Sequence, residues 1–187
     1  METLTWKGPI AFNKFSGKPD NNELNEKGLY LMCIKPNKNK DEYAVYYVGA
    51  APLNSIYKVV HQLYLDTNNK RVGMYLDPKA EADFGILIKD SIADKNRINK
   101  NNDIINYNTK NTWIFYFVPD DKLIKYIKKD KNLSDPILEL KGVVKNILRR
   151  KMESRKYNLS LENPRHGLDY NDYKCELDNN EFSIIGF

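Results

Sequence analysis

Apolar residues near the start of the chain fall into two short runs separated by a polar loop. Residues 28–35 (GLYLMCIK) and 43–49 (YAVYYVG) are rich in β-branched and aromatic side chains, and the seven polar residues PNKNKDE join them. Runs of this length and composition, bounded by turn-forming residues, are typical of β-strands. The pattern predicts a β-hairpin with a long loop.

Helical periodicity follows the second run. Apolar residues recur at spacings of three and four between residues 53 and 65, which predicts an amphipathic helix. The apolar positions are Leu53, Ile56, Val60, Leu63 and Tyr64.

Residues 66–111 are polar and rich in asparagine, with short apolar stretches only. We expect this segment to be an insertion with one or two short strands, around Val72–Leu76 and Gly85–Ile88. The sequence TWIFYFVP at 112–119 is a continuous apolar run, which is typical of a buried central strand.

Two more helices are predicted after this strand. The first should begin at Asp120 or Asp121 and end near Asn132. The second should begin after Ser-Asp-Pro at 134–136, because proline is tolerated in the first turn of a helix. The apolar faces comprise Leu123, Ile124 and Ile127 in the first helix, and Ile137, Leu140, Val144, Ile147 and Leu148 in the second.

The order of these elements predicts an α+β domain with a small central β-sheet flanked by helices. A chain of 187 residues is long enough to bury the core of one such domain. We expect an N-terminal extension at 1–27, the domain itself at 28–158 with the 66–111 insertion, and a C-terminal tail at 159–187. Within the tail, FSIIGF could supply a last edge strand.

Charge is unevenly distributed along the chain, although the net charge is only +5. Residues 121–158 contain twelve Lys and Arg against five Asp and Glu, whereas the tail is acidic, with two basic and six acidic residues. A basic segment of this density could neutralise phosphates of a nucleic acid. It could equally be a solvated helix surface, so charge alone leaves both interpretations open.

Several classes of protein are excluded by composition. The two cysteines, Cys33 and Cys175, provide no disulfide framework, and the chain has too few Cys and His for a zinc site. No phosphate-binding glycine loop, Gly-x-Ser-x-Gly elbow, signal sequence or long apolar span is present. We therefore expect a cytoplasmic protein with no membrane association.

The Gly-Leu-Tyr run, the Tyr-Val-Gly run and the helices that follow occur in an order that resembles the GIY-YIG nuclease superfamily. Tyr30 matches the first family tyrosine, Tyr47 the second, and His61 lies fourteen residues after Tyr47, on the first helix. Glu139 is similar to the metal-binding glutamate, with Glu153 as an alternative, and Asn158 to the asparagine that closes the motif. The resemblance covers 28–158 apart from the insertion.

The resemblance implies a metal-dependent endonuclease of restriction, phage or mobile-element type that cleaves DNA. Glu139 would bind Mg²⁺ or Mn²⁺, and Tyr30, Tyr47 and His61 would activate water or bind phosphate. A tyrosine of ordinary pKa is a poor base at neutral pH, so nearby cations would have to lower the pKa. Taken alone, the two tyrosines could equally be packing residues.

One position departs from the family pattern. Tyr57 stands where the family carries the arginine that clamps the scissile phosphate, and tyrosine cannot offer a bidentate fork. The alternative is therefore a catalytically degenerate domain that binds nucleic acid or a protein partner without cleavage, and a homodimer also stays open. Candidate nucleic-acid contacts are Lys58, Arg71, Lys145, Arg149, Arg150 and Asn158.

Overall fold

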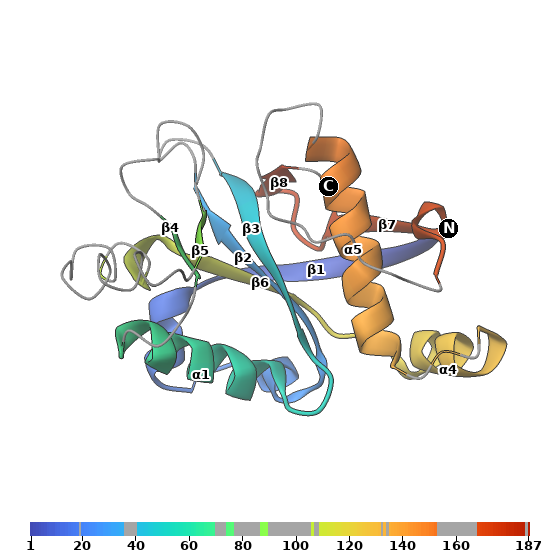
Figure 1. The fold of residues 1–187 in the computed structure, drawn as a ribbon, viewed down its shortest axis with the longest axis horizontal. Coiled ribbons are helices and arrows are strands. Elements are labelled where there is room, and N and C mark those ends of the chain that lie inside the picture. The colour runs from blue at the N-terminus through green and yellow to red at the C-terminus, as the bar shows by residue number, and fades with distance from the viewer. Residues whose placement is uncertain are drawn as a thin grey trace.

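A six-stranded mixed sheet forms the centre of the fold (Figure 1). The computed structural model describes residues 1–18, 20–35, 41–69, 74–76, 87–89, 106, 109–131, 133, 135–152, 168–185 and 187. The strand order is β7-β1-β6-β2-β3-β8, and helices pack around the sheet, which confirms the α+β class. The strands are β1 (Glu2–Ala11), β2 (Gly28–Ile34), β3 (Glu42–Ala51), β6 (Trp113–Phe117), β7 (Tyr173–Leu177) and β8 (Ser183–Ile185).

The strands expected from the sequence are present. β2 pairs antiparallel with β3, which confirms the hairpin, and β6 pairs antiparallel with the other side of β2. Within the insertion, β4 (Met74–Leu76) and β5 (Leu87–Lys89) form a separate two-stranded antiparallel sheet. β8 is the edge strand expected in FSIIGF, and it pairs in parallel with β3.

The three predicted helices are confirmed, and their first residues are set by capping side chains. α1 (Ile56–Asn68) begins after Ser55, whose Oγ accepts a hydrogen bond from the Lys58 N–H at 3.2 Å. α4 (Asp121–Asp130) begins after Asp120, and α5 (Pro136–Met152) has proline in its first position. The cap explains why α1 starts later than the apolar pattern suggested, leaving Leu53 outside the helix and 82% exposed.

The segments 1–27 and 159–187 contribute strands to the same sheet. β1 lies inside it, between β7 and β6, although Gly8-Pro9 interrupts the sequence pattern of a strand. The register between β1 and β6 shifts between Lys7 and Ile10, so this dipeptide lies at a bulge, where proline is tolerated within a sheet. Two short 3-10 helices, η1 (Phe12–Ser16) and η2 (Asn22–Asn25), connect β1 to β2.

The sheet curls until it is nearly a barrel. β7 and β8 lie at opposite edges, yet only residues 178–182 connect them. Such a connection reaches about 20 Å, whereas the edges of a flat six-stranded sheet lie about 24 Å apart. Trp6 of β1, the neighbour of edge strand β7, accordingly contacts Phe187, which follows the other edge strand β8, with ring centroids 5.8 Å apart.

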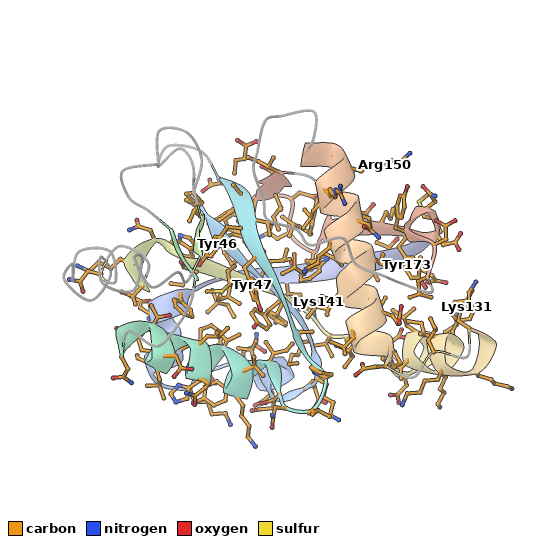
Figure 2. All side chains as sticks on the ribbon, in the orientation of Figure 1. Tyr46, Tyr47, Lys131, Lys141, Arg150 and Tyr173 are labelled. Atoms are coloured by element: carbon orange, nitrogen blue, oxygen red, sulfur yellow. The ribbon has the colours of Figure 1, made fainter. Side chains whose placement is uncertain are left out.

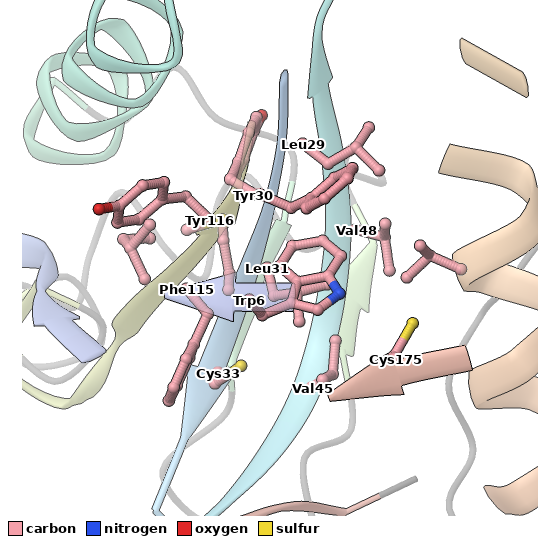
Figure 3. Close-up of a cluster of buried hydrophobic side chains, with 14 of the residues drawn as sticks. Trp6, Leu29, Tyr30, Leu31, Cys33, Val45, Val48, Phe115, Tyr116 and Cys175 are labelled. Atoms are coloured by element: carbon pink, nitrogen blue, oxygen red, sulfur yellow. The ribbon is translucent and has the colours of Figure 1, made fainter. Parts of the chain in front are cut away.

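α1 and α5 pack on opposite faces of the sheet, as the two helices in Figure 3 show. A Cβ placed on Gly28 would come within 2.9 Å of Ile56 Cδ1, so α1 covers the outer face to which Gly28 belongs. α5 contacts β2, β3 and β7 on the inner side. The core between them includes Leu4, Trp6, Leu31, Phe115 and Leu140, all fully buried.

Candidate functional site

Tyr30 on β2 and Tyr47 on β3 lie side by side on the outer face of the sheet. Tyr30 pairs with Gly49 and Met32 pairs with Tyr47, so the two tyrosines are diagonal neighbours on one face. Their ring centroids are 6.0 Å apart, with 47° between the ring planes. The structure therefore brings together the tyrosines of the two sequence motifs.

The ring of Tyr30 is packed directly on Gly49. A Cβ on Gly49 would lie only 1.9 Å from Cζ of Tyr30, a distance at which no side chain fits. The glycine of the Tyr-Val-Gly run is thus explained by the tyrosine of the Gly-Leu-Tyr run, because it leaves space for that ring. As a result, Tyr30 is 2% exposed.

Tyr30 and Tyr47 differ in burial, and this difference determines what each hydroxyl can do. The pKa of Tyr30 is raised well above its ordinary value, first by burial and then by its electrostatic interaction with Tyr47. Tyr30 consequently stays protonated at neutral pH and can donate a hydrogen bond, but it cannot serve as a base. Tyr47 is half-buried and so retains access to solvent.

Tyr47 also lies on a stretch of β3 with one open edge. β8 pairs with Glu42–Ala44 only. In the part of the chain that the structure describes, no strand pairs with the remainder of β3 on that side. The backbone of this stretch is therefore unpaired on one side, and Tyr47 and Ala50 are its half-buried side chains.

His61 projects from α1, which packs against η1 and against both strands of the tyrosine pair. Nδ1 of His61 lies 2.6 Å from the carbonyl oxygen of Phe15. Because a carbonyl oxygen only accepts hydrogen bonds, Nδ1 carries the proton. In the neutral imidazole, Nε2 is then left with a lone pair that can accept a proton.

Tyr57 stacks on this histidine instead of offering a cation. The ring centroids of Tyr57 and His61 are 5.4 Å apart and the planes differ by 22°. The phenol at the position of the family arginine therefore fixes the imidazole from one side while the Phe15 carbonyl holds it through Nδ1. Lys58, the neighbouring base on α1, is exposed.

A polar network on the same face was not predicted from the sequence. Tyr116 on β6 pairs with Tyr30, and its hydroxyl donates to Glu23 Oε2 at 2.9 Å and accepts from Asn21 Nδ2 at 2.7 Å. Glu23 also forms an ion pair with Lys7. The hydrogen bond from Lys7, followed by that from Tyr116, lowers the pKa of Glu23, and burial raises the pKa of Tyr116 to about 12. No local signal links these residues, because they come from β1, η2 and β6.

Glu139, the expected metal ligand, lies in the first turn of α5 and is half-buried. α5 packs along β3 from the inner side of the sheet, whereas α1 approaches β2 and β3 from the outer side. Both helices contact β2 and β3, so the sheet lies between α5, which carries Glu139, and the outer face of Tyr30 and Tyr47. The described residues contain no group of three or more His, Cys, Asp and Glu side chains arranged to hold a metal ion.

The expected nucleic-acid contacts on α5 lie in its C-terminal half, away from Glu139 in the first turn. Lys145 and Arg149 are half-buried, and Arg150 is exposed. Arg150 donates to Asn171 Oδ1 at 3.2 Å, and its guanidinium lies 5.3 Å from the ring centroid of Tyr170, so it is engaged by η5 (Tyr170–Asp172). Figure 2 shows Arg150 near the C-terminal end of α5. Arg71, Asn158 and Glu153 lie outside the described residues.

Cys33 and Cys175 are both free and buried, and burial raises the pKa of the Cys175 thiol to about 12. Among the described helices, none combines the length and the apolar character needed to cross a membrane.

The sequence matches no protein-family model, and comparison with curated proteins and with solved structures found no similar protein.

Proposed function

We propose that the protein is a GIY-YIG-like endonuclease that hydrolyses phosphodiester bonds of DNA in the cytoplasm, at the open edge of β3. The observation that carries this proposal is the placement of Tyr30 and Tyr47, whose ring centroids lie 6.0 Å apart on the face covered by the helix of His61. Had the tyrosines faced opposite sides of the sheet, they could not have served one site.

The geometry favours different roles for the two phenols. Tyr30 remains protonated, and its ring packs behind that of Tyr47, with 6.0 Å between the centroids. Tyr47 is half-buried at the open edge, so its hydroxyl is the one available to orient a water molecule or bind a phosphate oxygen. His61, with Nδ1 held by Phe15, offers Nε2 as the base that accepts the proton of the water.

The donor chemistry of Glu139 fits a hard divalent cation such as Mg²⁺ or Mn²⁺. A half-buried carboxylate can hold such an ion while water and phosphate oxygens complete the coordination. Glu139 belongs to α5, which packs along β3 from the inner side, so an ion held there would act with Tyr47 only around the edge of β3. When bound, the cation would neutralise charge that develops on the phosphoryl oxygens.

Incubation of the protein with plasmid and with linear duplex DNA, in Mg²⁺ or Mn²⁺, tests the proposal. We expect cleavage that falls at least about a hundredfold in Tyr47→Phe and in Glu139→Gln. Tyr64→Phe is the matched control, since Tyr64 is a half-buried tyrosine of α1 that packs edge-on against Phe12. Failure of the wild-type protein to cleave any DNA, methylated or unmethylated, would exclude the nuclease.

A second candidate is a non-cleaving domain that binds nucleic acid or a protein partner. The stack of Tyr57 on His61 favours it, because a phenol supplies no charge to clamp a phosphate. This candidate predicts no cleavage by the wild-type protein, and for a nucleic-acid binder, an affinity for DNA that falls steeply with salt concentration. An absence of DNA binding would leave the protein-partner version.

A further inference from the structure

α4 presents a lysine-rich face to solvent. Lys122, Lys125, Lys128 and Lys129 are all exposed on this ten-residue helix, and their spacing places them on one side of it. The acid on that side is Asp121, which sits in the first turn, where a carboxylate offsets the positive end of the helix dipole. The face therefore has a net positive charge at neutral pH.

The opposite side of α4 is packed against the protein. Ile127 is fully buried, and Leu123 and Ile124 are half-buried against the core. An amphipathic helix that binds a membrane inserts its apolar side into the lipid, and here that side is occupied. Tyr126 adds an aromatic ring, 38% exposed, at the border of the lysine face. The ammonium of Lys131 lies 5.8 Å from the centroid of this ring and adds a further positive charge beside the lysine face.

A groove of about 800 Å³ connects this face to α1. Lys128 of α4, Lys58 of α1 and Lys27 before β2 all line it. Glu26, Asp121 and Asp135 line it as well, and Asp135 Oδ1 already accepts hydrogen bonds from the N–H groups of Ile137 and Leu138. The groove alone is thus electrically balanced, and the excess of positive charge comes from α4.

The groove lies at the end of β3, because Pro52–Ser55, which follow this strand, form part of its lining. Ala51 lies four residues after Tyr47 on β3, a distance of roughly 13 Å in a strand. Phosphates recur about every 3.4 Å along each strand of duplex DNA. A backbone in the groove would therefore be only a few phosphates away from Tyr47.

We propose that the lysine face of α4, continued through the groove by Lys128 and Lys58, holds the phosphate backbone of DNA next to the Tyr47 edge. This inference rests on the proposed function for the identity of the partner. Of the contacts expected from the sequence it keeps Lys58, and it adds the lysines of α4, which were not among them. Since it concerns binding, it can be tested without cleavage.

Fluorescence anisotropy with labelled duplex DNA in EDTA, measured over a range of salt concentrations, provides the test. Three double variants remove equal charge: Lys125→Ala/Lys129→Ala on α4, Lys58→Ala/Lys128→Ala at the groove, and Lys14→Ala/Lys110→Ala as control. Lys14 and Lys110 are exposed and lie near the start of β6, since Phe12 N–H bonds to the Thr112 carbonyl there, at the opposite end of that strand from α4.

We expect each of the first two variants to weaken binding about tenfold and to reduce the salt slope by about 2, with the control unchanged. Equal losses in all three variants, or wild-type affinity in the first two, would overturn the inference while leaving the nuclease proposal intact. Binding of phosphatidylserine vesicles in preference to DNA would also overturn it. If DNA is bound through these lysines but never cleaved, the inference holds and the nuclease proposal fails.

Discussion

The ring of Tyr30 occupies the space in which a side chain on Gly49 would have to lie, with 1.9 Å between Tyr30 Cζ and the position of a Gly49 Cβ. The two residues pair directly across β2 and β3. A tyrosine of one motif and a glycine of the other therefore depend on each other, and the pair positions the buried phenol behind Tyr47.

We predict that Gly49→Ala destabilises the protein by about 1–3 kcal/mol, because the new methyl group must displace the Tyr30 ring. Chemical denaturation monitored by circular dichroism measures the change. Gly17→Ala is the matched control, since a Cβ there meets no atom within 4 Å. In the double variant with Tyr30→Leu, the cost of Gly49→Ala should shrink. An additive effect would contradict the direct clash.

Tyr57→Arg should increase cleavage at least about tenfold, because the guanidinium restores a bidentate phosphate ligand beside His61. The initial rate of plasmid nicking is the measurement, with Tyr57→Phe as control, which keeps the ring stack and adds no charge. A lower rate in Tyr57→Arg than in Tyr57→Phe would indicate that the stack matters more than the missing cation.

The hydrogen bond of His61 predicts which ring nitrogen carries the proton. Because Nδ1 bonds to the Phe15 carbonyl at 2.6 Å, the neutral imidazole should be the Nδ1–H tautomer, which is the less common form in free histidine. Nitrogen-15 chemical shifts of the ring report the tautomer, and His166→Gln assigns the signals of the two histidines. An Nε2–H tautomer for His61 would contradict the hydrogen bond and remove Nε2 as a base.

Alkaline pH should destabilise the protein. Burial raises the pKa of Tyr116 and of Tyr173 to about 12 and raises that of Tyr30 as well, from an ordinary value of 10.0. A folded-state pKa above the unfolded one means that the folded protein holds more protons, so stability is complete below pH 10 and is lost as pH rises through that range. The free energy of unfolding should decline above pH 10, and the decline should be shallower in Tyr173→Phe. A flat profile would contradict the burial of these phenols.

Elements governed by local patterns were predictable from the sequence, and those governed by distant partners were not. The hairpin, β6 and the three helices follow from apolar periodicity and capping residues such as Ser55 and Asp120. β1 was missed because Gly8-Pro9 interrupts its pattern, and a bulge between the pairs Lys7–Tyr116 and Ile10–Ile114 accommodates the dipeptide. The same limit applies to β7, whose partner β1 lies far away in the sequence.

In the candidate site, too, features set by local sequence were predictable and contacts between distant residues were not. The spacing of Tyr30, Tyr47 and His61 indicated a shared site before any geometry was known. The Phe15 carbonyl and the Tyr116–Glu23 hydrogen bond could not be anticipated, because neither residue type nor spacing links them to the motifs. The stack of Tyr57 on His61 is the contact that separates the two candidate functions, and the sequence revealed only that an arginine was missing there.

The position of β1 in the middle of the sheet sets an order for folding during translation. β1 leaves the ribosome first, but its neighbours are β6 and β7, more than 100 residues later in the chain. At common rates of synthesis, roughly 5–20 residues per second, β1 would wait about 5–20 s for β6 alone. Throughout that time, a strand containing Leu4 and Trp6 has no partner on either side. The nascent protein is therefore expected to depend on chaperones that bind exposed apolar strands.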